Sequence, residues 1–485
     1  MIMAKEQELL KARKQLAELE KFVEQSVRGG RRIDEVERGL FEGLLELGRS
    51  LLSAFVAAQG DGDQGPSIRR AEKTLQRSEA PAERRYVSIF GELRIARYVY
   101  TQRAKQKGCA PLDAQWGLPA GDFSYVLEDW LQRLCVREAF AESCGSLADL
   151  LGVQVSVRAA EHLSQVMAQH VEPFQAKQPP PAAAEEGEIL VATFDGKGIP
   201  MRRPLEERVR SGPRRRKGEK ANQKQMACVA GVYSIDRFRR TAEDVLDEVR
   251  RRQRRDERPL PQHKRVWAEL THLHEGETYN GRALAFIGAA IELLQRDPQE
   301  QKPVVCVTDG ERALIDDIAV WLPPRTVHIL DIMHVLERLW QAAYCFHAEG
   351  SRAAEAFVDH RLRRLLQGQV GGVIGGLRRM LTVQALTGEK RRVLRDVIRY
   401  YDNHRESMRY DQYLAAGYPI GSGVVEGACR HLVKDRMERT GMRWTVLGAR
   451  AILQLRAVYL NDDWQDFVNY RIEAEQTALY RKRAA

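Results

Sequence analysis

Apolar residues recur through residues 1–58 at the spacing of amphipathic helices, with charged residues between them. The pattern predicts two helices separated by the pair Gly29-Gly30. Their apolar stripes consist of Leu9, Ala12, Leu16, Leu19 and Val23 before the glycines, and Val36, Leu40, Leu44, Leu47, Leu51 and Phe55 after them. A helical hairpin packed on its own domain and the seam of a dimer would both produce these stripes. Because the glycine-rich run GDGDQGP follows, residues 1–66 are predicted to form an N-terminal helical or coiled-coil region.

The next region, residues 67–174, is predicted to bind DNA through a β-hairpin and helix-turn-helix-like helices. Polar and apolar residues alternate across residues 85–103, which is typical of a hairpin. The stretch SLADLLGVQVSVRAAEHL places a glycine turn between two helical patterns, with Ser156 capping the second helix. Arg158 and His162 would face outward on that helix and could contact DNA. An ordinary helical pair would give the same pattern.

Two short apolar runs after a proline-rich linker at residues 175–186 predict buried strands. Ile189–Phe194 leads directly into Asp195, and Val304–Val307 leads into Asp309. A carboxylate at the end of a buried strand is costly unless something pairs with it, although Asp-Gly is also a common turn pair. If the two strands are neighbours, both carboxylates lie near one edge of the sheet. Such a pair can hold two magnesium ions about 4 Å apart.

A third acidic residue is predicted on a helix that follows a glycine turn at residues 421–423. Glu426 is favoured because it follows the turn closely and lies among apolar residues. Glu438 is a competitor further along the same helix, and an early glutamate is also favoured by the helix dipole alone. Asp331 and His334, at the junction of another predicted strand and helix, would support the site.

The order of strand and helix patterns predicts an α/β fold with helices on both faces of a mixed sheet. Its first strands would form a meander and its later strands would lie parallel. Residues 187–334 would form the first part of this core, and residues 335–415 read as an all-α insertion. Residues 416–485 would supply the helix with the third acid and a tail.

The 485 residues carry a formal net charge of +10, which suggests a polyanionic partner. A basic run at residues 202–224 lies beside Asp195 in the sequence. In the predicted catalytic part of the chain, from residue 187 onward, the residues predicted to contact phosphates or bases are Lys197, Arg202, Arg203, Arg214, Arg215, Arg216, Lys217, Arg430, Lys434, Arg436, Arg439, Arg443 and Trp444. The seven cysteines are scattered without a CxxC pair, which is typical of a reduced, cytoplasmic protein. No apolar run is long enough to cross a membrane, so no membrane partner is expected.

Four motifs carry a resemblance to a known family. They are TFDGKG around Asp195, VTDGE around Asp309, ILDIMHVLERLW around Asp331, and YPIGSGVVEGACRHLVKDRMERTGMRW around Glu426. Together they resemble bacterial insertion-sequence transposases of the ISKra type, which have an RNase H-like core. The resemblance implies that Asp195, Asp309 and Glu426 form an Asp-Asp-Glu catalytic and metal-binding triad. Asp331 and His334 are similar to a D-x-x-H element of Mutator-like relatives.

The resemblance also implies a reaction and its partners. The expected reaction is DNA strand cleavage followed by strand transfer, with two Mg²⁺ ions as cofactors and Mn²⁺ as a substitute. The expected partners are double-stranded DNA, at the element ends and the target, and further copies of the chain in a homodimer or higher oligomer. Two alternatives remain: an RNase H-like structure-specific nuclease, and a non-catalytic helix-turn-helix DNA-binding protein.

Overall fold

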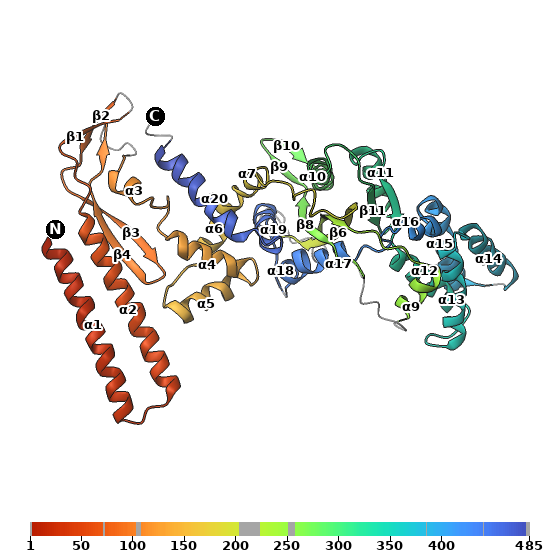
Figure 1. The fold of residues 1–485 in the computed structure, drawn as a ribbon, viewed down its shortest axis with the longest axis horizontal. Helices are drawn as coiled ribbons and strands as arrows, with labels where there is room; N and C mark the ends of the chain where they lie inside the picture. Colours follow the sequence, from red (N-terminus) through yellow and green to blue (C-terminus); the bar gives the residue numbers. More distant parts are fainter. Residues whose placement is uncertain are drawn as a thin grey trace, which may run out of the picture. The chain divides into compact units, whose positions relative to one another are not determined.

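The computed structural model describes residues 2–70, 73–102, 108–202, 224–250, 258–384, 386–439 and 441–481. The chain divides into two compact units (Figure 1). Unit 1 consists of Met1–Ala176 and Asp462–Ala485, and unit 2 consists of Lys177–Asn461. The boundary between the two units, after Ala176, therefore lies within residues 175–186, which the sequence predicts to be a linker.

Unit 1 opens with two long helices, α1 (Ile2–Arg28) and α2 (Ile33–Gln59), which form the predicted hairpin. Small residues let these helices approach closely. A Cβ atom on Gly39 or Gly43 would lie 2.4 Å from a side-chain atom of Phe22 or Leu19, respectively. The seam between the helices therefore depends on these two glycines.

The rest of unit 1 contains short strands and a group of packed helices. The strands are β1 (Ser67–Arg70), β2 (Lys73–Arg77), β3 (Ala82–Ser88), β4 (Gly91–Arg97) and β5 (Tyr100–Thr101). The helices are α3 (Pro111–Gln115), α4 (Tyr125–Cys135), α5 (Phe140–Leu151), α6 (Val157–Ala168), α7 (Val171–Gln175), α20 (Trp464–Gln476) and the π-helical turn η3 (Thr477–Arg481). β3 and β4 form the predicted hairpin. The predicted helical pair is α5 and α6, which contact each other and α4.

The chain returns to unit 1 through α20, which the sequence-based division had grouped with the catalytic helix in residues 416–485. A buried ion pair explains this return. Arg471 of α20 donates to the carboxylate of Glu128 on α4, and both side chains are almost inaccessible to solvent. Arg471 Nε also donates to Glu475 at 2.7 Å, and His170 lies 3.5 Å from the same carboxylate. Since buried charges require such partners, residues 462–481 pack as part of unit 1.

The centre of unit 2 is a five-stranded mixed sheet with the order β12-β11-β6-β7-β8. Its strands are β6 (Ile189–Pro200), β7 (Lys224–Ile235), β8 (Gln262–Leu270), β11 (Val304–Thr308) and β12 (Val327–Leu330). β6, β7 and β8 form an antiparallel meander, whereas β11 runs parallel to both β6 and β12. This confirms the predicted mixed α/β sheet. A separate small hairpin consists of β9 (His272–His274) and β10 (Glu277–Tyr279).

Helices cover both faces of the sheet because the strands alternate two sets of apolar side chains. One face, including Leu190, Ala192 and Phe194, packs against α10 (Gly281–Arg296) and α11 (Arg312–Trp321). The opposite face, including Val191, packs against the helical insertion. The remaining helical elements of unit 2 are α9 (Ala242–Val249), α12 (Ile332–Tyr344), α13 (Arg352–Leu366), α14 (Val370–Val383), α15 (Gly388–Asn403), η1 (Arg405–Ser407), α16 (Tyr410–Ala416), α17 (Gly423–Ala428), η2 (Cys429–Lys434), α18 (Asp435–Met437) and α19 (Val446–Leu460).

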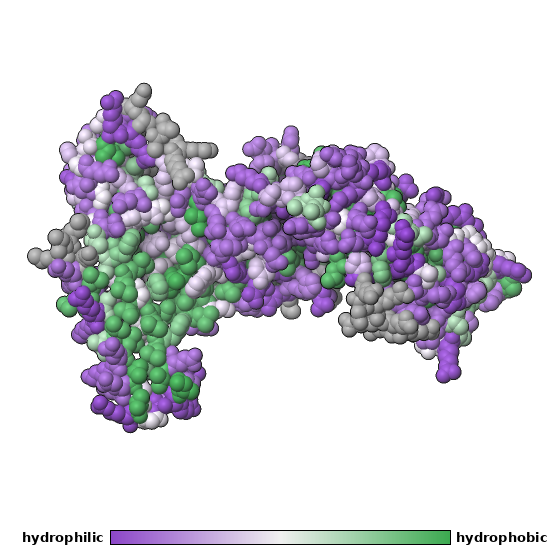
Figure 2. All heavy atoms as spheres, viewed as in Figure 1, coloured by the Kyte–Doolittle hydropathy of each residue, from purple (hydrophilic) through white to green (hydrophobic). Residues whose placement is uncertain are grey.

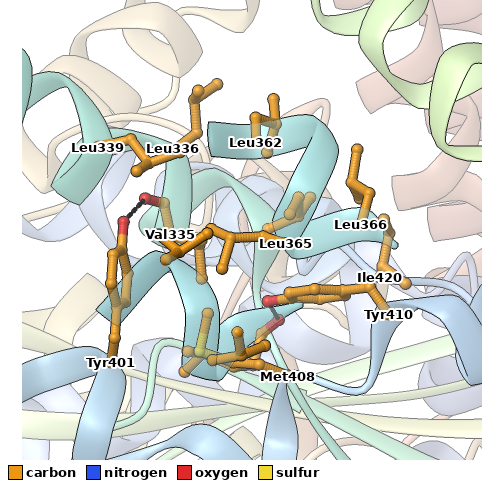
Figure 3. Close-up of a cluster of buried hydrophobic side chains, with 14 of the residues drawn as sticks. Val335, Leu336, Leu339, Leu362, Leu365, Leu366, Tyr401, Met408, Tyr410 and Ile420 are labelled. Carbon is orange, nitrogen blue, oxygen red and sulfur yellow. Dashed lines mark hydrogen bonds between the residues drawn. The ribbon is translucent and has the colours of Figure 1, made fainter. Parts of the chain in front are cut away.

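The helical insertion shares its core with the sheet, so it is not an independent appendage. Leucines of α12 and α13 pack with Met408, Tyr410 and Ile420 in one buried cluster (Figure 3). Within it, the hydroxyl of Tyr410 donates to the carbonyl of Leu330 at 2.7 Å, at the end of β12. The insertion therefore fixes the strand end that precedes Asp331.

Among the described residues, no helix has both the length and the apolar character that crossing a bilayer requires.

Candidate functional site

Three aspartates lie at corresponding positions along three neighbouring parallel strands. Val307 of β11 is the ladder partner of Thr193 in β6, and β12 continues the same ladder on the other side of β11. Asp195 follows Thr193 by two residues, and Asp309 follows Val307 by two residues. Asp331 follows the end of β12 directly, and its backbone N–H donates to the carbonyl of Thr308 at 2.9 Å. The strands that lead into Asp195 and Asp309 are therefore neighbours, which is the condition under which the sequence places both carboxylates near one edge of the sheet.

The strand that carries Asp195 differs from the prediction in length. The sequence suggested that the strand ends at Asp195, because two glycines follow. β6 continues instead to Pro200, since Gly196 and Gly198 pair with Cys228 and Met226 of β7. Asp195 therefore lies within a paired strand, where its side chain is half-buried.

The carboxylate of Asp195 is held by two hydrogen bonds. Oδ1 accepts the backbone N–H of Gly196 at 2.7 Å. Oδ2 accepts the thiol of Cys429 at 3.1 Å, from the π-helical turn η2 that follows α17. Burial and the charge of Asp195 raise the pKa of Cys429, so this thiol stays protonated and remains a donor. Cys429 was not singled out from the sequence, although it comes three residues after Glu426, which is the spacing of one helix face.

The loop that carries Asp309 is held by the insertion. Asp309 Oδ1 accepts the backbone N–H of Glu311 at 2.8 Å. The hydroxyl of Tyr400 donates to the Asp309 carbonyl at 2.6 Å, and His404 Nε2 lies 2.7 Å from the Gly310 carbonyl. Burial, followed by the Asp309 charge, raises the pKa of Tyr400, which keeps its hydroxyl protonated. Sequence reasoning could not find Tyr400 and His404, because they contact backbone atoms more than 90 residues away.

Glu426 lies in α17, which packs across β6 and β7. This short helix covers the face opposite α10: a Cβ atom added to Gly231 of β7 would meet Thr193 of β6 and Val424 of α17 within 3.6 Å. Thr193 and Asp195 point to the same face of the sheet because side chains alternate along a strand. The helix with Glu426 therefore lies over the face to which Asp195 points.

The structure brings Glu426 together with Asp331 and His334. One ligand atom of each lies within 4.8 Å of the others, the only such group of three among the residues that the structure describes. Asp331 is fully buried, whereas Glu426 is exposed. His334 Nδ1 is a buried atom without a hydrogen-bond partner and lies 3.9 Å from Asp331 Oδ2. Asp195 and Asp309 are not part of this group. The predicted triad of Asp195, Asp309 and Glu426 therefore does not form one ligand cluster of this size among the described residues.

Asp331 is tied to the start of α17 by Ser422. The backbone N–H of Ser422 donates to Asp331 Oδ2 at 2.7 Å, and the Ser422 hydroxyl bonds to the same oxygen. Ser422 Oγ also lies 3.3 Å from Glu426 Oε1. Ser422 occupies the N-cap position of α17, but its side chain makes no cap hydrogen bond and binds Asp331 instead.

The competitor Glu438 has different partners. Its carboxylate bonds to Lys224 Nζ and lies 3.8 Å from Lys197 Nζ, so two lysines of β6 and β7 neutralise it. Lys197, a predicted phosphate contact, is therefore engaged within the protein. Of the two glutamates, only Glu426 therefore lies beside Asp331 and His334 in the described part of the chain.

Two predicted DNA contacts near this helix are wrong because their side chains are buried. Arg436 is fully inaccessible, and its guanidinium lies 4.9 Å from the centre of the Trp444 ring. Trp444 is 5% exposed, and its indole N–H donates to the Met437 carbonyl at 3.1 Å. Both side chains fix the segment after η2 against the end of β6, where Trp444 forms a bridge with Met201.

Other predicted contacts remain accessible. Exposed side chains include those of Arg158, His162, Arg202, Arg430, Lys434, Arg439 and Arg443. Arg203, Arg214, Arg215, Arg216 and Lys217 lie outside the described residues. A further basic stripe was not recognised in the sequence: Arg391, Arg395 and Arg399 follow one another at four-residue spacing on the exposed side of α15. The same helix carries Tyr400, which binds the Asp309 loop.

No protein-family model matches this sequence, and no curated protein matches it significantly.

Proposed function

We propose that this protein is a DNA transposase with an RNase H-like catalytic unit, which cleaves and joins DNA with the help of divalent metal ions. The observation that carries this proposal is the position of Asp195, Asp309 and Asp331 along three adjacent parallel strands, with the helix that bears Glu426 packed on β6 and joined to Asp331 through Ser422. The sheet, with its antiparallel meander of β6, β7 and β8 and its parallel strands β11 and β12, is compatible with the RNase H-like core that the resemblance implies. The motifs around the four acids supply the resemblance to insertion-sequence transposases.

The donor set suits magnesium or manganese. Carboxylate oxygens are the ligands that these hard cations prefer, and only a few protein ligands are needed. The orphaned Nδ1 of His334 beside two carboxylates also fits a cation site, because a buried polar atom otherwise lacks a partner. Asp195, Asp309 and Glu426 would hold the two ions, with Asp331 and His334 in support. When bound, such ions activate the attacking hydroxyl and stabilise the leaving oxygen in phosphoryl transfer.

The chain's own residues would orient these ligands. Cys429 and the Gly196 N–H hold the Asp195 carboxylate, while the Glu311 N–H holds that of Asp309. Tyr400 and His404 fix the backbone around Asp309 from the insertion. Ser422 connects Asp331 to the helix that carries Glu426. Ligands positioned by such outer hydrogen bonds require less rearrangement when substrate arrives.

DNA is the proposed substrate because the accessible basic side chains can contact phosphates. These include the stripe on α15, the arginines after Glu426, and Arg158 with His162 on the second helix of the predicted helix-turn-helix. A basic, reduced chain of this kind would act in the bacterial cytoplasm, on the nucleoid. Membranes play no part in the proposed function.

The test is incubation of the purified protein with the DNA that flanks its own gene, with and without Mg²⁺, followed by mapping of the DNA ends. Transposition predicts cleavage at defined ends and joined products, both dependent on the metal. Cleavage of branched DNA without joining would instead support the structure-specific nuclease. Specific binding without any metal-dependent cleavage would support a non-catalytic DNA-binding protein and contradict the proposal.

A further inference from the structure

The α1–α2 hairpin exposes an unusually large apolar surface. Figure 2 shows hydrophobic residues gathered along both helices on the face turned to the viewer. We call the following exposed residues the hairpin face: Leu16, Val23 and Val27 of α1, and Ile33, Phe41, Leu44, Leu51 and Phe55 of α2. Each is between 39% and 81% exposed. Isolated apolar residues are normal on a protein surface, but a continuous patch marks an interaction site.

The packing of the hairpin explains why these side chains remain uncovered. The seam between α1 and α2 uses small residues, including Gly39 and Gly43, which accept Phe22 and Leu19 of the other helix. Gly48 lies among the hairpin-face residues of α2, between Leu44 and Leu51, and the ring of Phe90 from the β3–β4 turn packs against it. The hairpin face lies beside this seam on both helices, according to the 3.6-residue period. Phe55 also contacts Trp116, with 5.6 Å between the ring centres, but every side chain of the face remains at least 39% exposed.

We propose that the hairpin face binds the same face of a second copy of this chain, so that two hairpins form a four-helix bundle. The exposed area is large enough for a stable dimer. Half-exposed side chains of this size present roughly 100 Å² each, so the eight together approach the roughly 800 Å² that each partner buries in a stable complex. A two-fold axis across the hairpin would bring identical patches together.

The distribution of charge favours a second hairpin over a polyanionic partner. Between Leu40 and Phe55, the helical period places uncharged residues on the hairpin face, whereas Glu42, Glu46 and Arg49 lie on the other side of α2. DNA would find no cation at the centre of this face. Two carboxylates, Glu20 of α1 and Glu37 of α2, lie on the face by the same period and would repel a polyanion, whereas a matching apolar surface removes the uncharged side chains from water. This association does not depend on the proposed catalysis.

A charge-exchange experiment with the full chain tests the dimer. One variant carries Leu44→Glu and Leu51→Glu, and a second carries Leu44→Lys and Leu51→Lys. Both positions are about half exposed, 54% and 49%, so neither change opens the core. The control carries Val320→Glu and Val383→Glu, which are 67% and 70% exposed elsewhere in the chain. Molar mass is measured by sedimentation equilibrium at micromolar concentrations without DNA.

The wild type and the control are expected to have the molar mass of a dimer. Each charged variant alone is expected to have the molar mass of a monomer. A mixture of the Glu and Lys variants should return to the doubled mass, which an unfolded variant could not do. A monomeric wild type would overturn the proposal. So would charged variants that remain dimeric, since the interface would then lie elsewhere. A mixture that stays monomeric would also contradict the proposal, because opposite charges at facing positions should restore an interface between two hairpin faces.

Discussion

Asp331 and Ser422 join the end of β12 to the start of α17, although 91 residues separate them in the sequence. Asp331 Oδ2 accepts both the backbone N–H and the hydroxyl of Ser422. Because Glu426 lies one helical turn after Ser422, this contact fixes where the Glu426 carboxylate can lie. The helical insertion lies between these two residues in the sequence, so the contact joins the two ends of the segment that contains it.

The first prediction concerns this link. Asp331→Asn should lower metal-dependent DNA cleavage by about 10- to 100-fold, as loss of a residue that orients a metal ligand typically does. Ser422→Ala should have a smaller effect, because its backbone N–H still donates. Ser351→Ala, which removes the N-terminal cap of α13, is the control for a purely structural loss. Equal activity of Asp331→Asn and the wild type in the cleavage assay would show that the link does not position Glu426.

A second prediction concerns the arginine stripe on α15. Replacing Arg391, Arg395 and Arg399 with Gln should weaken DNA binding and reduce the slope of log affinity against log salt by about 0.9 for each phosphate that the variant no longer binds. The control carries the same change to Gln at Lys11, Arg13 and Lys14, which are exposed on α1. Binding is measured by fluorescence anisotropy at several salt concentrations. The same slope in the stripe variant and the wild type would mean that the stripe is only solvated.

The third prediction is a pH dependence of stability that arises from His328. This residue of β12 lies 2.9 Å from Thr308 Oγ1 and 2.8 Å from Ser407 Oγ. Burial, followed by the charge of His404, lowers the pKa of His328 from 6.5 to about 4. The folded protein therefore binds fewer protons than the unfolded chain between these values. Stability is complete above pH 6.5 and is lost as the pH falls towards 4.

The expected loss from His328 is about 2 kcal/mol between pH 7.5 and pH 5, from the linkage of protonation to unfolding. Urea unfolding of the wild type and of His328→Gln at both pH values measures it. The variant should be less stable at pH 7.5, where the two hydrogen bonds of the imidazole are altered, but should lose less stability on acidification. An equal loss in both proteins would assign the acid sensitivity to other groups.

The sequence was sufficient where local patterns determine the structure. The runs Ile189–Phe194 and Val304–Val307 are apolar and partly β-branched, so they could be recognised as buried strands without knowledge of their neighbours. Gly29-Gly30 separated the two long helices, and Ser156 began a helix as expected. These features depend on interactions within a few residues.

The sequence was insufficient where a contact joins distant segments. The Gly-Lys-Gly that follows Asp195 resembles a turn, but pairing with β7 keeps it extended. Arg436 and Trp444 carry groups that commonly contact nucleic acid, and only the packing of η2 against β6 shows that they are buried. The grouping of Glu426 with Asp331 and His334 depends equally on tertiary structure, because no spacing rule relates a helix to a strand end 95 residues earlier.

The last prediction distinguishes the two candidates for the third acid, Glu426 and Glu438. Changing a carboxylate to its amide removes the charge but retains the volume, so neither variant should unfold. Glu426→Gln removes an exposed carboxylate that lies beside Asp331 and His334 and has no lysine partner among the described residues. Metal-dependent cleavage should therefore fall by several orders of magnitude. Metal-independent DNA binding should persist, because the basic surfaces are unchanged.

Glu438→Gln should instead behave as a structural change. It weakens the contacts with Lys197 and Lys224, and pairs that are partly open to solvent typically contribute less than about 1 kcal/mol each. Cleavage should stay close to that of the wild type, with a small fall in the melting temperature. The two variants are compared in the same cleavage assay and in thermal unfolding. If Glu438→Gln is inactive and Glu426→Gln is active, the third acid is Glu438 and not Glu426. Full activity of both would contradict a metal site on this helix, since neither carboxylate would then be needed to bind the ions.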